Sequence, residues 1–349
     1  MSVTIALAGN PNCGKTTMFN ALTGANQYVG NWPGVTVEKK EGKLKNQKDV
    51  TVTDLPGIYS LSPYTLEEVV SRDYLLKEKP DVIIDLVDAT NIERNLYLAT
   101  QLLEIGIPVV IALNMVDLLK KNNIHINVKG LSSALGCPIV ETSALKGTGL
   151  KEVVDEAIKC ANQHRVPSKQ MEFPKAVEKA VNEIESLVPA NISEENKRWY
   201  AVKLLERDSK VKEGLNLPAS AQSKIEEIAS NLEKAEDDDT ESIVTDGRYQ
   251  YIQKAVSANV KRSGNKMTVS DKIDRIVTNR ILGLPIFILT MFIVYYVSVT
   301  TVGTMVTDWT NDSFVGTIQG VVADGLSGVG VADWLVSLVS DGIIGGLGA

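Results

Sequence analysis

The order of apolar and polar positions divides the chain into three regions. Over residues 1–166, short apolar runs of strand length alternate with stretches in which apolar residues recur every three or four positions. Over residues 167–265 the strand-like runs stop and only the helical spacing remains, among many charged residues. Residues 281–303 carry no charged residue. The pattern therefore predicts an α/β domain, an all-α domain and a transmembrane helix, in that order.

The first region is predicted to form a mostly parallel sheet covered by helices. Strands are expected at residues 3–8, 38–44, 49–54, 81–87, 107–113 and 138–142. Helices are expected at residues 16–22, 92–105, 127–135 and 149–163. Four polar residues separate the second strand from the third, which favours a hairpin at a sheet edge. Elsewhere strands alternate with helices, and this order is typical of parallel pairing.

The second region is predicted to be a small helical domain. Its helices are expected near residues 174–188, 194–208, 219–235 and 240–262. An acidic run at residues 236–239 lies between the last two. We interpret this run as a solvated loop between helices rather than as a metal site.

The third region is long enough to cross a membrane, because about 20 residues span the hydrocarbon core. Seven cations and two anions lie between residues 254 and 280, whereas residues 300–349 hold no Lys or Arg. By the positive-inside rule we expect cytoplasmic N-terminal domains, a basic juxtamembrane segment at residues 266–280 and a transmembrane helix at 281–303. Residues 304–349 are then expected to be extracytoplasmic or interfacial.

Composition narrows the class of protein. The chain has 349 residues, more than one compact core usually holds, and its net charge of −7 disfavours nucleic acid as the main partner. The three cysteines are irregularly spaced and predict neither a disulfide framework nor a metal site. The N-terminus lacks the basic start of a secretory signal. These features suit a reducing cytosol.

A complete phosphate-loop pattern lies between the first strand and the first helix. It comprises Gly9, Asn10, Pro11, Asn12, Cys13, Gly14, Lys15 and Thr16. The glycines allow backbone N–H groups to face phosphate oxygens, and the helix N-terminus adds a favourable potential. We expect Lys15 to reach the β- and γ-phosphates and the Thr16 hydroxyl to bind Mg²⁺.

Three shorter motifs follow later strands, at the sheet edge where open α/β sheets bind ligands. The first of them is Asp54, Leu55, Pro56 and Gly57. Its carboxylate can hold the Mg²⁺ shell, and its glycine N–H can meet a γ-phosphate.

The other two motifs predict a guanine site. The first comprises Asn114, Met115 and Asp117, and the second comprises Ser143, Ala144 and Leu145. The carboxylate of Asp117 can accept two N–H bonds from guanine, a donor pair that adenine lacks, so the site discriminates strongly. A backbone N–H of residues 143–145 can face the guanine O6. Each motif is weak alone, but their order and spacing make the set specific.

Together these residues resemble a Ras-like P-loop GTPase, and residues 29–38, Val-Gly-Asn-Trp-Pro-Gly-Val-Thr-Val-Glu, are similar to switch I of the FeoB family of ferrous iron transporters. The resemblance implies nucleotide contacts that extend to Thr17, Gly34, Val35 and Thr36. It also implies that Thr36 joins Thr16 and Asp54 around Mg²⁺. Members of the family are typically about twice this length, so the chain resembles the N-terminal part of one.

The same resemblance bears on hydrolysis. Ile58 stands where Ras-type enzymes place a water-orienting glutamine, so slow intrinsic hydrolysis is expected. In potassium-activated relatives, the counterpart of Asn12 helps to hold K⁺ together with switch I carbonyls, here those of Gly30 and Trp32. The expected catalytic set is Lys15, Asn12, Thr36 and Gly57, with stimulation by K⁺.

The resemblance implies a GTP-binding and GTP-hydrolysing part of a ferrous iron (Fe²⁺) uptake transporter, in the inner (plasma) membrane of a bacterium. The implied partners are GTP and GDP, transported Fe²⁺, further copies of the chain and small accessory transport proteins. One alternative is a membrane-tethered regulatory or assembly GTPase with no transport role. Another, an RNA-associated GTPase, is disfavoured by the net charge and the membrane helix.

Some residues have two interpretations at this stage. Cys13 either serves as a small residue or has a pKa lowered by the helix N-terminus, which would favour redox chemistry. Trp32 either shields the nucleotide or packs against the protein. His125 and His164 have polar neighbours in the sequence and are expected to face solvent.

Overall fold

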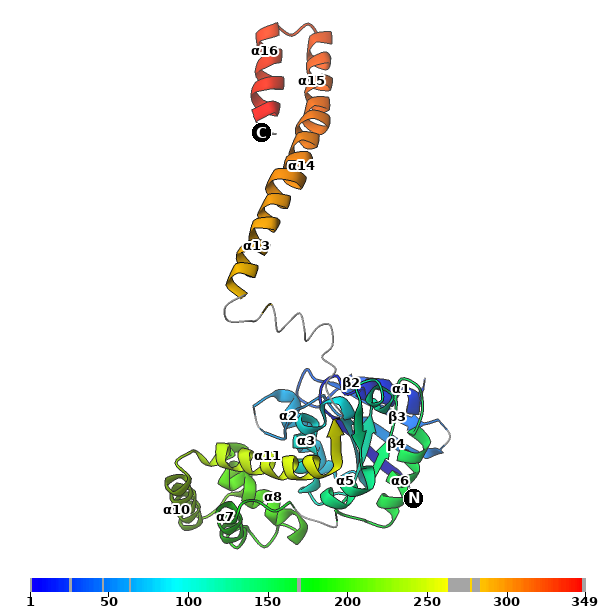
Figure 1. The fold of residues 1–349 in the computed structure, drawn as a ribbon, viewed down its shortest axis with the longest axis vertical. Helices are drawn as coiled ribbons and strands as arrows, with labels where there is room; N and C mark the ends of the chain where they lie inside the picture. The colour runs from blue at the N-terminus through cyan, green and yellow to red at the C-terminus, as the bar shows by residue number, and fades with distance from the viewer. Residues whose placement is uncertain are drawn as a thin grey trace. The chain divides into compact units, whose positions relative to one another are not determined.

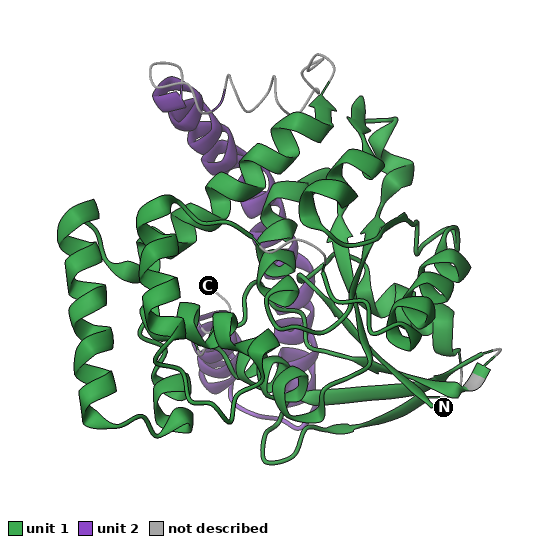
Figure 2. Cartoon of the chain, turned by 90° about the horizontal axis from the view of Figure 1, so that it is seen from below, with its two compact units in different colours: residues 1–264 green, residues 265–349 purple. Residues whose placement is uncertain are grey.

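The structure is a computed structural model that describes residues 2–24, 27–45, 47–62, 64–167, 171–262, 277 and 283–346. Two compact units make up the chain, residues 1–264 and residues 265–349 (Figure 2). Each is described below by itself. The basic juxtamembrane segment predicted at residues 266–280 lies outside the described residues.

A seven-stranded sheet in the order β2-β3-β4-β1-β5-β6-β8 forms the centre of the first unit (Figure 1). Its strands are β1 (Val3–Gly9), β2 (Gln27–Asn31), β3 (Glu38–Leu44), β4 (Gln47–Asp54), β5 (Val82–Asp88), β6 (Val109–Asn114) and β8 (Ile139–Glu141). Neighbours from β4 to β8 pair in parallel, while β2–β3 and β3–β4 are antiparallel. The α/β prediction and the hairpin are confirmed, and β2 is an additional edge strand.

Helices cover both faces of this sheet. They are α1 (Lys15–Thr23), α2 (Leu66–Asp73), α3 (Ile92–Leu103), α4 (Val116–Leu119), α5 (Val128–Leu135) and α6 (Leu150–Asn162). Two short helical segments are also present: η1 (Tyr74–Glu78) follows α2, and η2 (Ala89–Asn91) precedes α3. α2 was not predicted, although a capping box starts it: Glu68 N–H donates to Thr65 Oγ1, and the Glu68 carboxylate accepts from Thr65 N–H.

The second predicted domain is helical and packs against α3 and α5 within the same compact unit. Its helices are α7 (Lys175–Glu185), α8 (Glu194–Leu205), α9 (Ser209–Leu215), α10 (Ala219–Glu236) and α11 (Thr240–Asn259). α9 is additional to the prediction. Helix was expected to continue to residue 262, but it ends at Asn259. Residues Val260–Arg262 instead form strand β9, which pairs with β7 (Ile124–Ile126).

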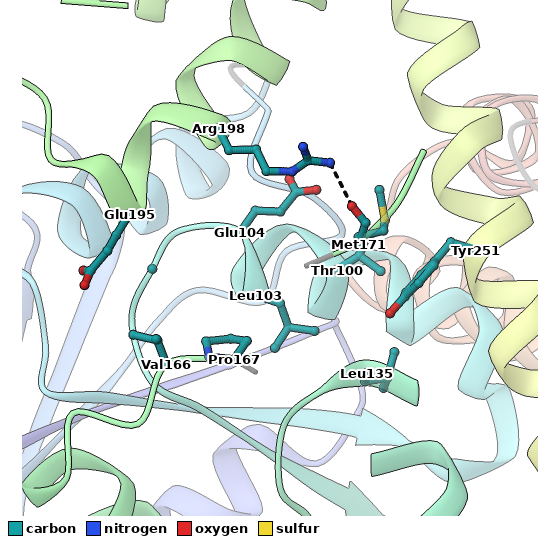
Figure 3. A pocket seen from close by; sticks show the side chains of 11 residues that line it. Thr100, Leu103, Glu104, Leu135, Val166, Pro167, Met171, Glu195, Arg198 and Tyr251 are labelled. Carbon is teal, nitrogen blue, oxygen red and sulfur yellow. Dashed lines mark hydrogen bonds between the residues drawn. The ribbon is translucent and has the colours of Figure 1, made fainter. Parts of the chain in front are cut away.

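Buried ion pairs join the helical region to the sheet region. Arg248 of α11 donates two hydrogen bonds, of 2.9 and 2.8 Å, to Glu104 at the end of α3. Beside this pair, a cavity of about 90 Å³ is lined by residues of both regions (Figure 3). Arg198 lies at its wall and donates to the Met171 carbonyl at 2.8 Å. The two regions therefore share one continuous interface.

The second unit contains one long helix and a short return. The helix runs from Gly283 to Gly328 through α13 (Gly283–Tyr295), η3 (Tyr296–Gly303), α14 (Thr304–Trp309), η4 (Thr310–Val315) and α15 (Gly316–Gly328). By length and composition it could cross a membrane. It shows no break at residue 303, so where a span would end stays a prediction. α16 (Asp333–Ser337) and η5 (Leu338–Gly345) then return along α15.

Candidate functional site

The phosphate-loop pattern forms the connection from β1 to α1, as its mechanism requires. Gly14 precedes the helix with a φ of 97°, and a Cβ added there would lie 2.4 Å from Asn114 Nδ2. A larger residue would therefore be strained and would collide with the neighbouring motif. Gly14 therefore shapes the backbone of the phosphate loop, and the loop that begins at Asn114 lies directly against it.

A cavity of about 620 Å³ lies between this loop and the two later motifs. It is lined by Asn10, Pro11, Asn12, Gly14, Lys15, Thr16, Thr17, Gly57, Asn114, Met115, Asp117, Leu118, Ser143, Ala144 and Leu145. Every one of these except Leu118 belongs to the predicted nucleotide set. The volume suits a small-molecule ligand. Segments from four different strand ends thus converge on one cavity.

Asn114 connects the loops of the cavity. Its Nδ2 donates to the Cys13 carbonyl at 2.8 Å, and its Oδ1 accepts from the Ala144 N–H at 2.9 Å. The side chain is buried at the end of β6. A single amide therefore holds the phosphate loop and residues 143–145 in a fixed relation.

Lys15 and Asp54 form a close ion pair. Lys15 Nζ lies 2.7 Å from Asp54 Oδ1, and both side chains are largely buried. Burial raises the pKa of Asp54, and the Lys15 ammonium opposes that rise. The pair places a cation and a carboxylate beside the phosphate loop. Asp54 and Thr16 carry the hard oxygen donors that Mg²⁺ prefers, and their role as its ligands stays a prediction.

Asp117 keeps its negative charge at the other end of the cavity. A hydrogen bond from Ser143 and the neighbouring Lys146 hold the pKa of Asp117 below its usual range. Lys146 Nζ lies 3.3 Å from Asp117 Oδ2. Sequence reasoning missed Lys146, although it directly follows the 143–145 motif. The ionised carboxylate can accept two hydrogen bonds from a ligand edge.

Several predicted residues do not line the cavity in this structure. For the nucleotide these are Gly9, Cys13, Gly34, Val35, Thr36, Asp54, Leu55 and Pro56, and for K⁺ they are Gly30 and Trp32. Asp54 still touches Lys15, whereas Thr36 is exposed on the surface. Trp32 is buried in the core, so of its two interpretations the structure supports packing. The expected roles of residues 30–36 stay predictions.

Cys13 and the acidic run can be compared with their interpretations. Burial, with the nearby Asp85 carboxyl, raises the pKa of the Cys13 thiol to about 12, so of its two interpretations the structure supports a small packed residue. Residues 236–239 and both histidines are exposed, as predicted. Among the described residues, no cluster of His, Cys, Asp and Glu could hold a metal ion.

Family models match both regions of the first unit. Residues 3–157 match the model described as ferrous iron transport protein B, and residues 173–261 match the FeoB cytosolic helical domain. The Fe(2+) transporter FeoB of Escherichia coli K12 is 37% identical over 358 residues, covering 99% of this chain and 44% of that protein. A Porphyromonas gingivalis FeoA/FeoB fusion protein is 39% identical, over 99% of this chain and 42% of the relative. The chain thus spans less than half the length of these relatives.

Solved structures agree. A GDP-bound mutant of the S. thermophilus FeoB G-domain is 47% identical, with a TM-score of 0.72, over 74% of this chain and 100% of that one. An S. thermophilus NFeoB structure with GDP, AlF4⁻ and K⁺ is 48% identical, with a TM-score of 0.68, over 73% of this chain and 99% of that one. With its GTPase fold and the helical domain that follows, the chain belongs to the FeoB family of ferrous iron transport proteins.

Proposed function

We propose that this chain binds GTP with Mg²⁺ and hydrolyses it slowly to GDP and phosphate. In this proposal it is the cytoplasmic GTPase part of a ferrous iron uptake transporter in a bacterial plasma membrane. One observation carries the proposal: the phosphate loop and the Asp117 carboxylate line the same cavity, with Asn114 bonded between their loops. A phosphate cradle and a guanine acceptor in one cavity are what a guanine nucleotide requires.

At the phosphate end, Lys15 exchanges its Asp54 partner for the β- and γ-phosphates. Its ammonium is held 2.7 Å from the carboxylate, and Lys15 also lines the cavity. Thr16, Asp54 and, after switch I moves, Thr36 are the residues that would hold Mg²⁺. The metal neutralises phosphate charge when bound. Gly57 lines the cavity, and its N–H would bind the γ-phosphate.

The hydrolytic step lacks a side chain that orients water. Ile58 is 2% exposed and packs in the core, so it presents no polar group to the cavity. Asn12 is exposed and lines the cavity, so its amide oxygen is available to a cation. We propose that K⁺ binds there with the carbonyls of Gly30 and Trp32, and that it stabilises the developing charge. An S. thermophilus NFeoB structure bound to GDP, AlF4⁻ and K⁺ supports the choice of cation.

Nucleotide state is coupled to the rest of the transporter through the helical domain. The switch II segment, residues 54–61, leads into α2, and Arg72 of α2 forms a buried ion pair with Asp208 at 2.7 Å. Tyr64 also bonds Glu241 of α11 at 2.7 Å. Movement of switch II is thereby transmitted to α9 and α11. Oligomer formation and small accessory transport proteins are further parts of the proposal.

Calorimetry of the chain in detergent with Mg²⁺ tests the nucleotide assignment. GTP and GDP should bind, and ATP should bind far more weakly; equal affinity for ATP and GTP would refute it. Turnover should be faster in K⁺ than in Na⁺ at matched ionic strength. Fe²⁺ uptake by cells that express the complete gene separates transport from the alternative of a tethered regulatory GTPase, since the tether predicts GTPase activity without uptake.

A further inference from the structure

The switch I segment, residues 29–38, is folded away from the cavity. Its first residues belong to β2, which pairs antiparallel with β3 over Gln27–Asn31. Thr36 then lies on the exposed surface and outside the cavity lining. GTPase switch segments are ordered by contacts to the γ-phosphate and Mg²⁺. A triphosphate therefore has to draw this segment out of its present position.

A tight turn fixes the middle of the segment. The Val35 N–H donates to the Trp32 carbonyl at 3.2 Å, Pro33 follows Trp32, and Gly34 has a φ of 78°. Proline second and a left-handed glycine third are the requirements of a type II turn. The turn engages one lone pair of the Trp32 carbonyl, the group that the proposed K⁺ site also needs. The hydrogen bond therefore constrains residues 32–35 in the present position of switch I.

The ring of Trp32 is seated against Tyr74 of η1, the segment that follows α2. It is 7% exposed and meets the Tyr74 ring edge to face, with centroids 5.2 Å apart. Leu55 and Ile58 of the switch II segment belong to the same buried cluster. Aromatic contacts of this kind contribute beyond the area they bury. The segment is therefore held by its side chain as well as by its backbone.

The seat is incomplete in one respect. Trp32 Nε1 is buried and has no hydrogen-bond partner among the described residues. An unpaired buried N–H opposes the gain from burying the ring. The indole is thus held less tightly than its contact area alone would indicate.

We propose that the Trp32 ring in its Tyr74 seat and the Trp32–Val35 turn form a latch that holds switch I open and lowers the affinity of the chain for GTP but not for GDP. The proposal rests on the proposed nucleotide function. Only the triphosphate recruits Thr36, so only its affinity is reduced by the fraction of molecules that are latched.

Tyr74 gives the sharpest test, because it lines the seat and not the nucleotide cavity. Tyr74→Leu removes the ring contact, while Tyr74→Phe keeps the ring and loses only the 3.1 Å hydrogen bond to Thr53. With Mg²⁺ present, the leucine variant should bind the non-hydrolysable analogue GMPPNP about threefold to tenfold more tightly. GDP affinity should stay unchanged, and the phenylalanine variant should match the wild type.

Gly34→Ala loosens the turn independently. A Cβ there would meet no atom within 4 Å, so the positive φ is the only cost of the substitution. We expect about fivefold tighter GMPPNP binding. Gly214→Ala is the matched control, because its surroundings are equally open and its φ is not in the left-handed region.

Fluorescence reports the ring directly. The emission difference between wild type and Trp32→Phe should lie at short wavelength with GDP and move to longer wavelength with GMPPNP and Mg²⁺. An unmoved Trp32 emission overturns the latch, as does a Tyr74→Leu variant whose affinities for both nucleotides change equally. If the wild type binds neither nucleotide, the proposed function falls and the latch falls with it.

Discussion

The loops proposed to cradle the nucleotide and the segment proposed to close over it are built differently. Asn114 bonds the phosphate loop and residues 143–145 at 2.8 and 2.9 Å. Switch I instead forms an edge strand and a turn away from the cavity. Recognition is thus pre-organised by hydrogen bonds between strand ends, which reduces the cost of ordering on binding. Switch I, which we call the trigger of the site, is held instead by contacts that can be exchanged.

Asp117→Ala should have the largest effect, because it removes the acceptor of two ligand N–H groups from the pre-organised part. Hydrogen bonds to a charged group contribute about 1.5–3 kcal/mol each, so GTP affinity should fall by roughly 10²–10⁴-fold. ATP affinity should stay as weak as before. Calorimetry with both nucleotides measures this. Lys146→Ala, which removes only the exposed partner of Asp117, is the control. A loss below tenfold for Asp117→Ala would contradict a guanine site.

Arg72→Ala tests whether switch II is anchored as firmly as the cradle. Both partners of the Arg72–Asp208 pair are almost fully buried, so the variant leaves an unpaired carboxylate in the interface. We expect a loss of about 3–5 kcal/mol in the free energy of unfolding, measured with urea.

The double variant Arg72→Met with Asp208→Asn separates charge from packing. Asparagine can keep the bond that Asp208 makes to the Val211 N–H at the start of α9. Without a buried unpaired charge, the double variant should regain most of the lost stability. If it is as unstable as Arg72→Ala, the ion pair is not the anchor.

Asp85 makes the pre-organised part sensitive to pH. It lies on the central strand β5, 1% exposed, and neither carboxylate oxygen has a partner among the described residues. Burial raises the pKa of Asp85 to about 7. The folded chain therefore binds more protons than the unfolded chain between about pH 4 and 7, and its stability falls as pH rises through that range.

The expected loss between pH 5 and pH 8 is up to about 3 kcal/mol, and Asp85→Asn should abolish it. Urea unfolding of both proteins at the two pH values measures the difference. A wild type that is equally stable at both pH values would mean that Asp85 is already paired or ionised.

Sequence reasoning located the cradle because its residues follow apolar strands. β1 and β6 are mostly apolar and largely buried, and they end at Gly9 and Asn114, the first residues of two of the predicted motifs. β2 was missed because Gln27–Asn31 lacks a buried face: Tyr28 and Val29 are both exposed. α2 was also missed, although Thr65 and Glu68 form a capping box that is visible in the sequence.

The position of switch I could not be predicted from local sequence. The seat of Trp32 is made by Tyr74, which is 42 positions away in the chain, and by the cluster around Leu55. Likewise β9 ends α11 early, because its pairing with β7 satisfies backbone groups that a helix would otherwise use. Both features depend on contacts between distant segments, which periodicity does not report.

Thr36→Ala should have the smallest effect on nucleotide affinity and stability. It distinguishes the cradle from switch I, because only switch I carries Thr36. Its side chain is exposed and lies outside the cavity, so the free energy of unfolding and the affinity for GDP should change by less than about 0.5 kcal/mol. Affinity for GMPPNP with Mg²⁺ should fall about tenfold, because one hydroxyl ligand is lost only in the closed state. Thr36→Ser keeps that hydroxyl and should bind as the wild type does. Equal losses for GDP and GMPPNP would place Thr36 in the fixed cradle and remove the distinction between cradle and trigger.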